Sequence, residues 1–205
     1  SEYGTTYRVY ATFDAPTNEL IAVYGTVSEA QNAPLSVVST TGFYNPETGA
    51  DFGQDINPAF FGFFPELEFD SWFTIGTENS NGDGGISSVG LETYLQGFNT
   101  GNGFTVDTFL GASWFVVPGT NSDAIAGDDN KVLVAQLTTV GVVTLVMNFQ
   151  YDDLEGNSYN TDGLTVTFPE VPSGCTDATA CNYDADAEAD DGSCVFPGDV
   201  CDDGC

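Results

Sequence analysis

The stretch from Lys131 to Tyr151 reads KVLVAQLTTVGVVTLVMNFQY, and its second half has the clearest pattern in the chain. Every second residue there is strongly apolar, namely Val143, Leu145, Met147 and Phe149. Between them lie Thr144, Val146, Asn148 and Gln150. Successive side chains of a strand point to opposite faces, whereas a helix would spread this period of two around its circumference. The stretch therefore predicts two strands, 131–140 and 142–151, joined near Gly141 as a hairpin near the centre of the fold.

Shorter runs of the same character lie on either side of this hairpin. They are 5–13, 20–25, 35–40, 105–109, 113–117 and 164–168. Clusters of turn-forming residues separate them, among others at 14–18, 45–49, 127–130 and 160–163. We find no convincing amphipathic helix pattern. We therefore expect residues 1–168 to form an all-β domain, an antiparallel β-sandwich of jelly-roll or immunoglobulin-like type, with an irregular barrel as the alternative.

The charge balance restricts what this chain can bind. It has 31 acidic residues against Arg8 and Lys131, which gives a formal net charge of −29 at pH 7. Nucleic acid is excluded as a partner because its phosphates require Lys and Arg, and anionic membranes are disfavoured for the same reason. No apolar run approaches about 18 residues, so we expect no membrane insertion. Folding must tolerate self-repulsion through salt screening or bound cations.

Most catalytic chemistry is also missing. The chain has no histidine, which removes the Ser-His-Asp and Cys-His mechanisms and His-ligated zinc. Glu66 with Glu68 or Asp70 is the first carboxylate pair to consider for glycoside hydrolysis. Adjacent carboxylates in such an acidic chain are typical of a solvated face, however. We expect no enzymatic activity.

An aromatic stretch interrupts the strand pattern between Pro58 and Pro65. It contains four phenylalanines, namely Phe60, Phe61, Phe63 and Phe64. One interpretation is a loop that folds these rings over one end of the sandwich. The other is an aromatic surface for self-association or for stacking on sugars. Four Phe in five residues exceed what one loop tip usually hides, so we predict self-association through them into a homo-oligomer or fibre.

A polar loop at 77–85 has a weak resemblance to a calcium-binding loop. Asn79, Asn81 and Asp83 alternate before Gly84, as oxygen ligands do at the start of an EF-hand. The twelfth position is Gly90 instead of glutamate, and no flanking helices are evident. A plain loop is the favoured interpretation.

The last thirty residues have a different composition. Residues 169–173 form a short, Pro-containing linker, and 174–205 contain all five cysteines, which are Cys175, Cys181, Cys194, Cys201 and Cys205. A segment this short cannot bury an adequate apolar core, so disulfides or a hard cation on converging carboxylates must hold it together. Clustered cysteines favour an extracellular location, either secreted or on the cell surface.

Residues 174–194 follow a specific sequence motif. It resembles the G-C-T-D-x-x-A-C-N-Y-D-x-x-A-x-x-D-D-G-S-C repeat of large secreted and cell-surface proteins of marine bacteria and some aquatic microbes. The resemblance implies an extracellular, cation-dependent structural module, which we expect to be incomplete at Cys205. The acidic and amide positions of the repeat are Asp177, Asn182, Asp184, Asp190 and Asp191. We predict that these residues bind calcium, which prefers six to eight oxygen ligands.

The same resemblance implies a disulfide pairing. Five cysteines cannot pair internally without a remainder. Related repeats often carry Leu in place of Cys181, which leaves only the outer two and implies Cys175–Cys194. We then expect Cys181 to pair with Cys201 or Cys205. The remaining cysteine, for which Cys205 is the first candidate, would pair with a segment outside this chain or with a neighbouring subunit.

Together these observations predict an extracellular structural or adhesive protein. We expect a subunit of a self-assembling cell-surface fibre or matrix, stabilised by calcium and disulfides. The alternative is the carbohydrate-binding module of a secreted protein, in which Trp72, Trp114 or Tyr residues would form an exposed platform for a cell-surface glycan. Aromatics buried between subunits would indicate assembly, whereas a solvent-open aromatic row on one sheet face would indicate sugar binding.

Overall fold

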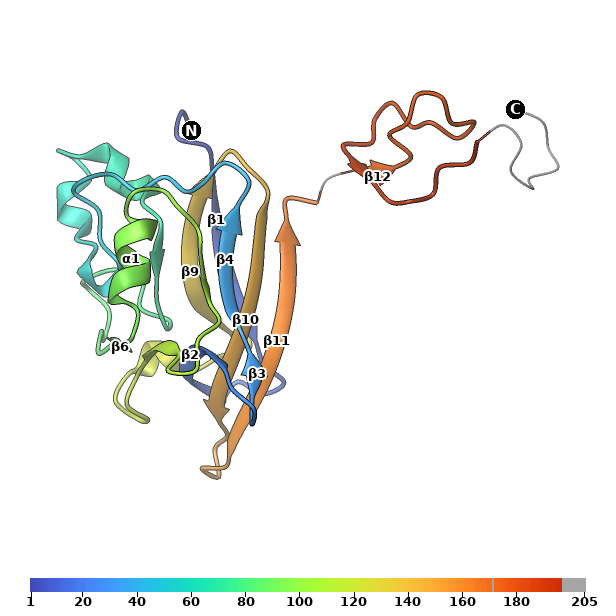
Figure 1. Ribbon diagram of the computed structural model, residues 1–205. Helices are drawn as coiled ribbons and strands as arrows, with labels where there is room; N and C mark the ends of the chain where they lie inside the picture. Colours follow the sequence, from blue (N-terminus) through green and yellow to red (C-terminus); the bar gives the residue numbers. More distant parts are fainter. Residues whose placement is uncertain (171, 197–205) are drawn as a thin grey trace. The chain divides into compact units, whose positions relative to one another are not determined.

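A computed structural model describes residues 1–170 and 172–196 of the chain (Figure 1). The chain divides into two compact units, Ser1–Val166 and Thr167–Cys205. The first unit is built mostly of antiparallel β-sheet, as the alternating pattern predicts. The second is a small module in which β12 (Ser173–Gly174) and β13 (Ala189–Asp190) pair in parallel.

The smaller sheet of the first unit has three strands. Its order is β1 (Thr5–Thr12), β9 (Lys131–Thr139) and β5 (Trp72–Phe73), and both pairings are antiparallel. Strand β9 lies in the middle, and every residue after Lys131 in it is buried. This burial on both faces explains why 132–135 is a continuous apolar run without alternation.

The larger sheet has eight strands, and β10 (Val143–Asp152) is at its centre. Its main path runs through β6 (Ser87–Val89), β8 (Ala112–Phe115), β2 (Glu19–Val27), β10, β4 (Leu35–Ser39) and β7 (Phe104–Val106). Off this path, β3 (Asn32–Ala33) pairs with β2 and β11 (Ser158–Phe168) pairs with β10. Strands β2 and β4 pair with successive halves of β10, at 148–152 and 143–146.

The predicted hairpin of 131–140 and 142–151 is wrong, although both strands exist. Strand β9 pairs with β1 and β5, whereas β10 belongs to the other sheet. The turn between them carries the chain from one layer to the other, and Gly141 makes this possible. A Cβ on Gly141 would lie 2.5 Å from the Thr41 hydroxyl and 2.6 Å from that of Thr40. A period of two predicts a strand, but it does not select the strand's partner.

Two further expectations are corrected. Residues 160–163, predicted as a turn, lie inside β11, where Gly163 has a φ of +70° and donates its N–H to the Asn148 side chain at 2.7 Å. A short helix, α1 (Glu92–Phe98), was not anticipated. Its buried residues Leu91, Leu95 and Phe98 have helical spacing, but seven residues are too few to stand out as a pattern. No described helix is long and apolar enough to cross a membrane.

Aromatic side chains join the two sheets. Phe73 of the small sheet lies 5.0 Å from Trp114 and 5.7 Å from Phe104, both of the large sheet, between ring centroids. It also lies 4.8 Å from Phe98 of α1. The indole N–H of Trp114 donates to the Thr74 carbonyl at 2.9 Å, so the buried ring is packed and its N–H has a hydrogen-bond acceptor. The core of the first unit lies between the sheets at this cluster.

We expect Phe73→Ala to lower the free energy of unfolding by about 3–5 kcal/mol, because it leaves a cavity among three other rings. Phe63→Ala is the matched control, since its ring is 80% exposed and should change stability by no more than about 0.5 kcal/mol. Urea unfolding of both variants measures the difference. Equal losses in the two variants would contradict this account of the core.

Candidate functional site

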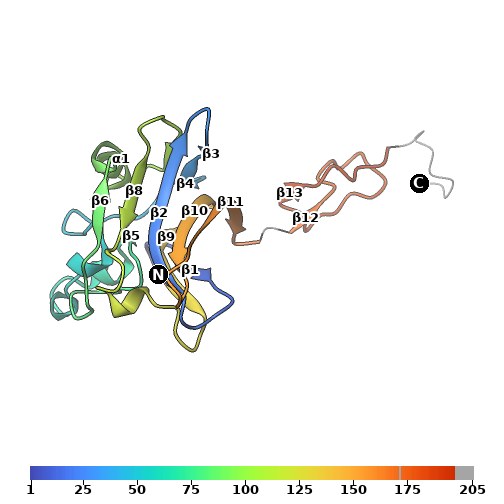
Figure 2. The same cartoon turned by 90° about the horizontal axis from the view of Figure 1, so that it is seen from below.

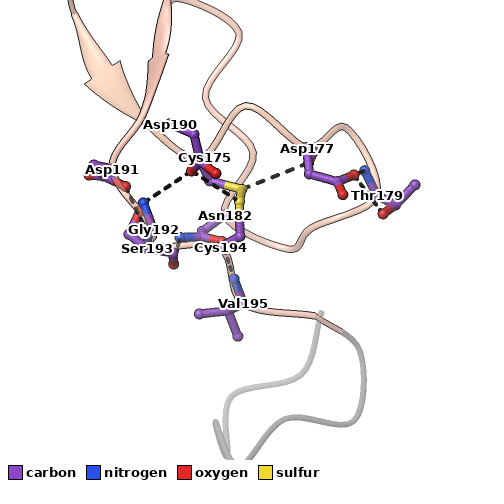
Figure 3. The surroundings of a disulfide bond; sticks show 10 residues. All are labelled: Cys175, Asp177, Thr179, Asn182, Asp190, Asp191, Gly192, Ser193, Cys194 and Val195. Carbon is purple, nitrogen blue, oxygen red and sulfur yellow. Dashed lines mark hydrogen bonds between the residues drawn. A yellow bond between two sulfur atoms is a disulfide. The ribbon is translucent and has the colours of Figure 1, made fainter.

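The C-terminal module contains the predicted disulfide. Cys175 and Cys194 are bonded, with their Cα atoms 4.8 Å apart and a sequence separation of 19 (Figure 3). The pairing implied by the repeat resemblance is therefore confirmed. On the chain-entropy model, closing a loop of this size stabilises the module by about 3 kcal/mol. The predicted partners of Cys181, which are Cys201 and Cys205, lie outside the described residues.

The four aspartates proposed as calcium ligands all stabilise local turns. Each accepts a backbone N–H from the residue two positions ahead: Asp177 from Thr179 at 2.8 Å, Asp184 from Asp186 at 3.0 Å, Asp190 from Gly192 at 3.1 Å and Asp191 from Ser193 at 2.9 Å. These are Asx turns, in which the carboxylate replaces a backbone carbonyl. The side-chain and backbone hydrogen bonds from Thr179 and Ser193 lower the pKa of Asp177 and Asp191.

Asn182, the fifth proposed ligand, connects two segments of the module. Its amide N–H donates to the Ser193 carbonyl at 2.7 Å, and its side-chain oxygen accepts the Val195 N–H at 2.8 Å. Figure 3 shows this side chain close to Cys194 of the disulfide. The contact has a structural role that the sequence pattern alone did not reveal.

The five predicted ligands therefore share one small module but do not converge on one point. Within residues 1–170 and 172–196, no group of three or more His, Cys, Asp and Glu side chains is placed to hold a metal. The module nevertheless concentrates ionised carboxylates on a short stretch of chain. Calcium binding remains a prediction, and it requires these carboxylates to turn toward a shared ion.

The aromatic loop, defined here as residues 57–65, packs one of its four phenylalanine rings against the first unit and exposes the other three to solvent. Phe61 packs against Ile56, Trp72 and Leu133. Phe60, Phe63 and Phe64 are 50%, 80% and 44% exposed. The short 3₁₀ helices η2 (Pro58–Phe60) and η3 (Pro65–Phe69) shape the loop. It is an ordered apolar surface, and it does not fold all four rings over the core.

A buried carboxyl follows this loop. Asp70 is 1% exposed and accepts the Ala50 N–H at 2.7 Å, while its backbone carbonyl accepts the Gln136 side chain at 2.8 Å. Gly49 is required beside it, because a Cβ there would lie 2.5 Å from the carboxylate. Burial raises the pKa of Asp70 to about 7, with a smaller contribution from the negative charge of Asp51. Asp70 is thus enclosed and does not form an open carboxylate pair with Glu66 or Glu68.

The polar loop 77–85 connects β5 to β6 and is tied to the 3₁₀ helix η4 (Ser122–Ala124). Asp123 accepts the Thr77 hydroxyl at 2.9 Å and the Asp83 N–H at 3.0 Å. Asp83 in turn accepts the N–H and the hydroxyl of Ser122. Hydrogen bonds to a neighbouring segment thus hold the loop, in agreement with its interpretation as a plain loop.

An acidic pocket of about 440 Å³ opens beside this loop. Its lining includes Glu78, Asp123, Asp128, Asp129 and Lys131. Both basic side chains of the chain form ion pairs with acidic residues of this lining. The Lys131 Nζ lies 3.5 Å from a carboxylate oxygen of Asp129, and a guanidinium nitrogen of Arg8 lies 2.8 Å from a carboxylate oxygen of Glu78. The sequence gives no sign of this pocket, because its lining residues come from segments that are distant along the chain.

The tryptophans exclude one version of the sugar-binding alternative. Trp72 and Trp114 are both buried in the first unit. Trp72 packs with Ile56 and Leu133, and Trp114 packs against Phe73. Because a stacking platform must present its ring faces to solvent, neither tryptophan can form one. The prediction that they would do so is wrong.

We expect calcium to raise the thermal unfolding midpoint, because a ligand that binds only the native state stabilises it by about 2.7 kcal/mol at a hundredfold excess over its dissociation constant. Calorimetry in excess chelator and in millimolar calcium, at equal ionic strength, measures the rise. Replacing Asp190 and Asp191 together by Asn should abolish most of it, because Asn retains the turn but not the charge.

The matched control for this experiment is Asp186→Asn with Glu188→Gln. It removes the same charge from two residues at variable positions of the repeat, and it should preserve the effect of calcium. Identical midpoints with and without calcium in the natural sequence would show that the module binds none.

Asp70 predicts a specific pH dependence. Its pKa of about 7 exceeds the ordinary value of an unfolded aspartate, so the folded state binds this proton more tightly. The stability that this proton contributes is fully present below about pH 4 and is lost as pH rises through about 7. As pH rises from 5 to 8, the free energy of unfolding of Asp70→Asn should therefore increase relative to that of the natural sequence by on the order of 2 kcal/mol.

Urea unfolding at several pH values measures this gain. Asp128→Asn, which removes an exposed carboxylate, is the charge-matched control. A constant stability difference between Asp70→Asn and the natural sequence over this range would refute the raised pKa.

No family model, no curated protein and no solved structure matches this chain.

Proposed function

We propose that this chain is a non-enzymatic, extracellular structural protein that self-associates through its aromatic loop into a cell-surface fibre or matrix. The observation that carries the proposal is the exposure of Phe60, Phe63 and Phe64 on an ordered loop. Isolated apolar residues on a surface are ordinary, but three exposed aromatic rings on one short loop are a feature that favours an interaction site.

The charge of the chain is a second argument for contact through the aromatic loop. Two copies, each with a net charge of −29, repel one another over most of their surface. Residues 57–65 contain no charged side chain, so two copies can approach there without desolvating carboxylates. Aromatic residues are enriched in the cores of protein interfaces, and charged residues are depleted there.

The anchoring of the loop also favours binding. Phe61 is packed against the body of the first unit, and Asn57 accepts the Ala59 N–H at 3.0 Å at the start of η2. A loop that is already ordered loses less conformational entropy when it is buried in a contact. The aromatic loop thus has the rigidity expected of an interface.

The disulfide supports an extracellular location, since such bonds persist in oxidising environments and are rare in reducing cytosols. In a calcium-rich exterior, cations bound by the C-terminal module would reduce the repulsion between subunits. Assembly and calcium binding would then reinforce each other in the same surroundings. The fibre or matrix is our proposal for the product of this assembly.

We expect Phe63→Asp to abolish or strongly weaken self-association, because it places a carboxylate on the aromatic loop. Phe109→Asp is the matched control: Phe109 is equally exposed, at 76%, but lies on a different loop. Sedimentation velocity over a range of concentrations, with electron microscopy of the assembled material, measures the effect. A natural sequence that stays monomeric with calcium present would refute the proposed function, and equal effects of the two variants would refute the role of the loop.

A further inference from the structure

Strand β11 forms an open edge of the large sheet. It is eleven residues long, and β10 is its strand partner in the described part of the chain. Because β2 and β4 occupy successive halves of one edge of β10, β11 takes the other edge. Figure 2 shows β11 at the end of this sheet, beyond β10. One row of its backbone N–H and C=O groups therefore faces no other strand of residues 1–170 and 172–196.

Gly163 lies within β11 with a φ of +70°. This is a left-handed conformation that favours glycine. Asp162 accepts the Tyr24 hydroxyl, and the Gly163 N–H bonds to Asn148. After Gly163, Leu164 and Val166 are two positions apart, so their side chains lie on the same face of β11.

Before Gly163, the Tyr159 side chain points inward, toward the small sheet. Tyr159 stacks on Tyr151 with ring centroids 5.3 Å apart, and Tyr151 contacts Phe13, just beyond β1, at 5.3 Å. At the opposite side of the molecule, Phe73 of β5 contacts Trp114 of β8. The end of the small sheet formed by β1 thus lies on the same side as β11.

Three apolar side chains of β11 are exposed. Tyr159, Leu164 and Val166 are 43%, 48% and 47% exposed. On the neighbouring β10, by contrast, the inward residues are buried, namely Val143, Leu145, Met147 and Phe149. Exposed apolar side chains and an open backbone edge therefore coincide on β11.

The edge also lacks the protection that natural sheet edges normally carry. Common devices are short length, lysine, proline or an inward-pointing charge. Strand β11 is long and has neither lysine nor proline. Its one charged residue, Asp162, is engaged by Tyr24 and by the Gln31 side chain at 3.4 Å. In a chain with a net charge of −29, this strip is nearly neutral.

We propose that β11 pairs edge to edge, antiparallel, with β11 of a second copy of this chain. The occupant follows from the charge: the strip is neutral and self-complementary, so a second copy meets the least repulsion there. Antiparallel pairing of identical strands creates a two-fold contact, the commonest symmetry of homodimers. The inference rests on the proposed self-association but uses a surface distinct from the aromatic loop.

The same reasoning selects a register. Centring the two-fold axis on Thr165 sets Leu164 opposite Val166 of the second copy, so the apolar residues cover one another. It also places the two Asp162 carboxylates six residues apart, which is about 20 Å at strand spacing. This separation exceeds the screening length of about 8 Å in physiological salt, so their repulsion is weak.

A cross-linking experiment on the full chain tests this register. Thr165→Cys should form a disulfide between two copies on mild oxidation, because residues opposite one another in an antiparallel pair have Cα atoms about 4.5–5.5 Å apart. Ser158→Cys is the control: it lies on the same strand, but this register places no strand residue opposite it. Peptide mapping identifies the bridge between the two introduced cysteines and separates it from bridges formed by the natural ones.

A charge variant tests the energetics. Val166→Asp should weaken dimerisation about tenfold or more in sedimentation velocity, since it buries a carboxylate at the contact. Val117→Asp, an equal change at an exposed valine after β8, should leave it unaffected. Circular dichroism checks that both variants fold. If Val166→Asp does not fold, the Thr165→Cys cross-link decides.

The outcomes separate the two proposals. Association that responds to Phe63→Asp but not to Val166→Asp, with no bridge at residue 165, would overturn the β11 contact and leave the proposed function intact. Equal weakening by Val166→Asp and Val117→Asp would also overturn it, as a general effect of charge. A natural sequence that stays monomeric would overturn both.

Discussion

Phe73 packs against Phe98, Phe104 and Trp114, and the rest of the first unit depends on this contact between its two sheets. A chain with 31 acidic and two basic residues has almost no ion pairs with which to offset its own repulsion. Only burial of apolar surface can then hold the layers together, at about 25 cal/mol for each Å² removed from water. The sheets accordingly meet at large aromatic rings.

The carboxylates are accommodated mainly by accepting hydrogen bonds from nearby groups. Asp153 accepts backbone N–H groups of Glu155 and Asn157 at the turn before β11, and the hydrogen bonds from Asn157 lower its pKa to about 2. The Asx turns of the C-terminal module and the contacts of Asp83 and Asp123 follow the same rule. These carboxylates thus stabilise turns without a neighbouring cation. Asp70 is the exception, because burial raises its pKa to about 7 and so favours its protonated form.

Repulsion also determines where two copies can meet. The aromatic loop and β11 are the two surfaces argued above to combine apolar exposure with little charge. A two-fold contact at one of them closes a dimer, whereas contacts at both would join dimers into an extended array. The proposed assembly would therefore have to overcome the same charge repulsion that opposes folding of the single chain.

The sequence by itself determined the secondary-structure class, because a period of two is a local property of strands, as at Val143–Phe149. The resemblance of residues 174–194 to a repeat implied the Cys175–Cys194 pairing that the structure contains, and the Phe-rich stretch pointed to a surface that is indeed largely exposed. Only the tertiary structure decided that β9 and β10 belong to different sheets, since partner choice depends on contacts between distant residues. It likewise placed Trp72, Trp114 and Asp70 inside and left β11 at an open edge, because burial is set by which layers cover a residue.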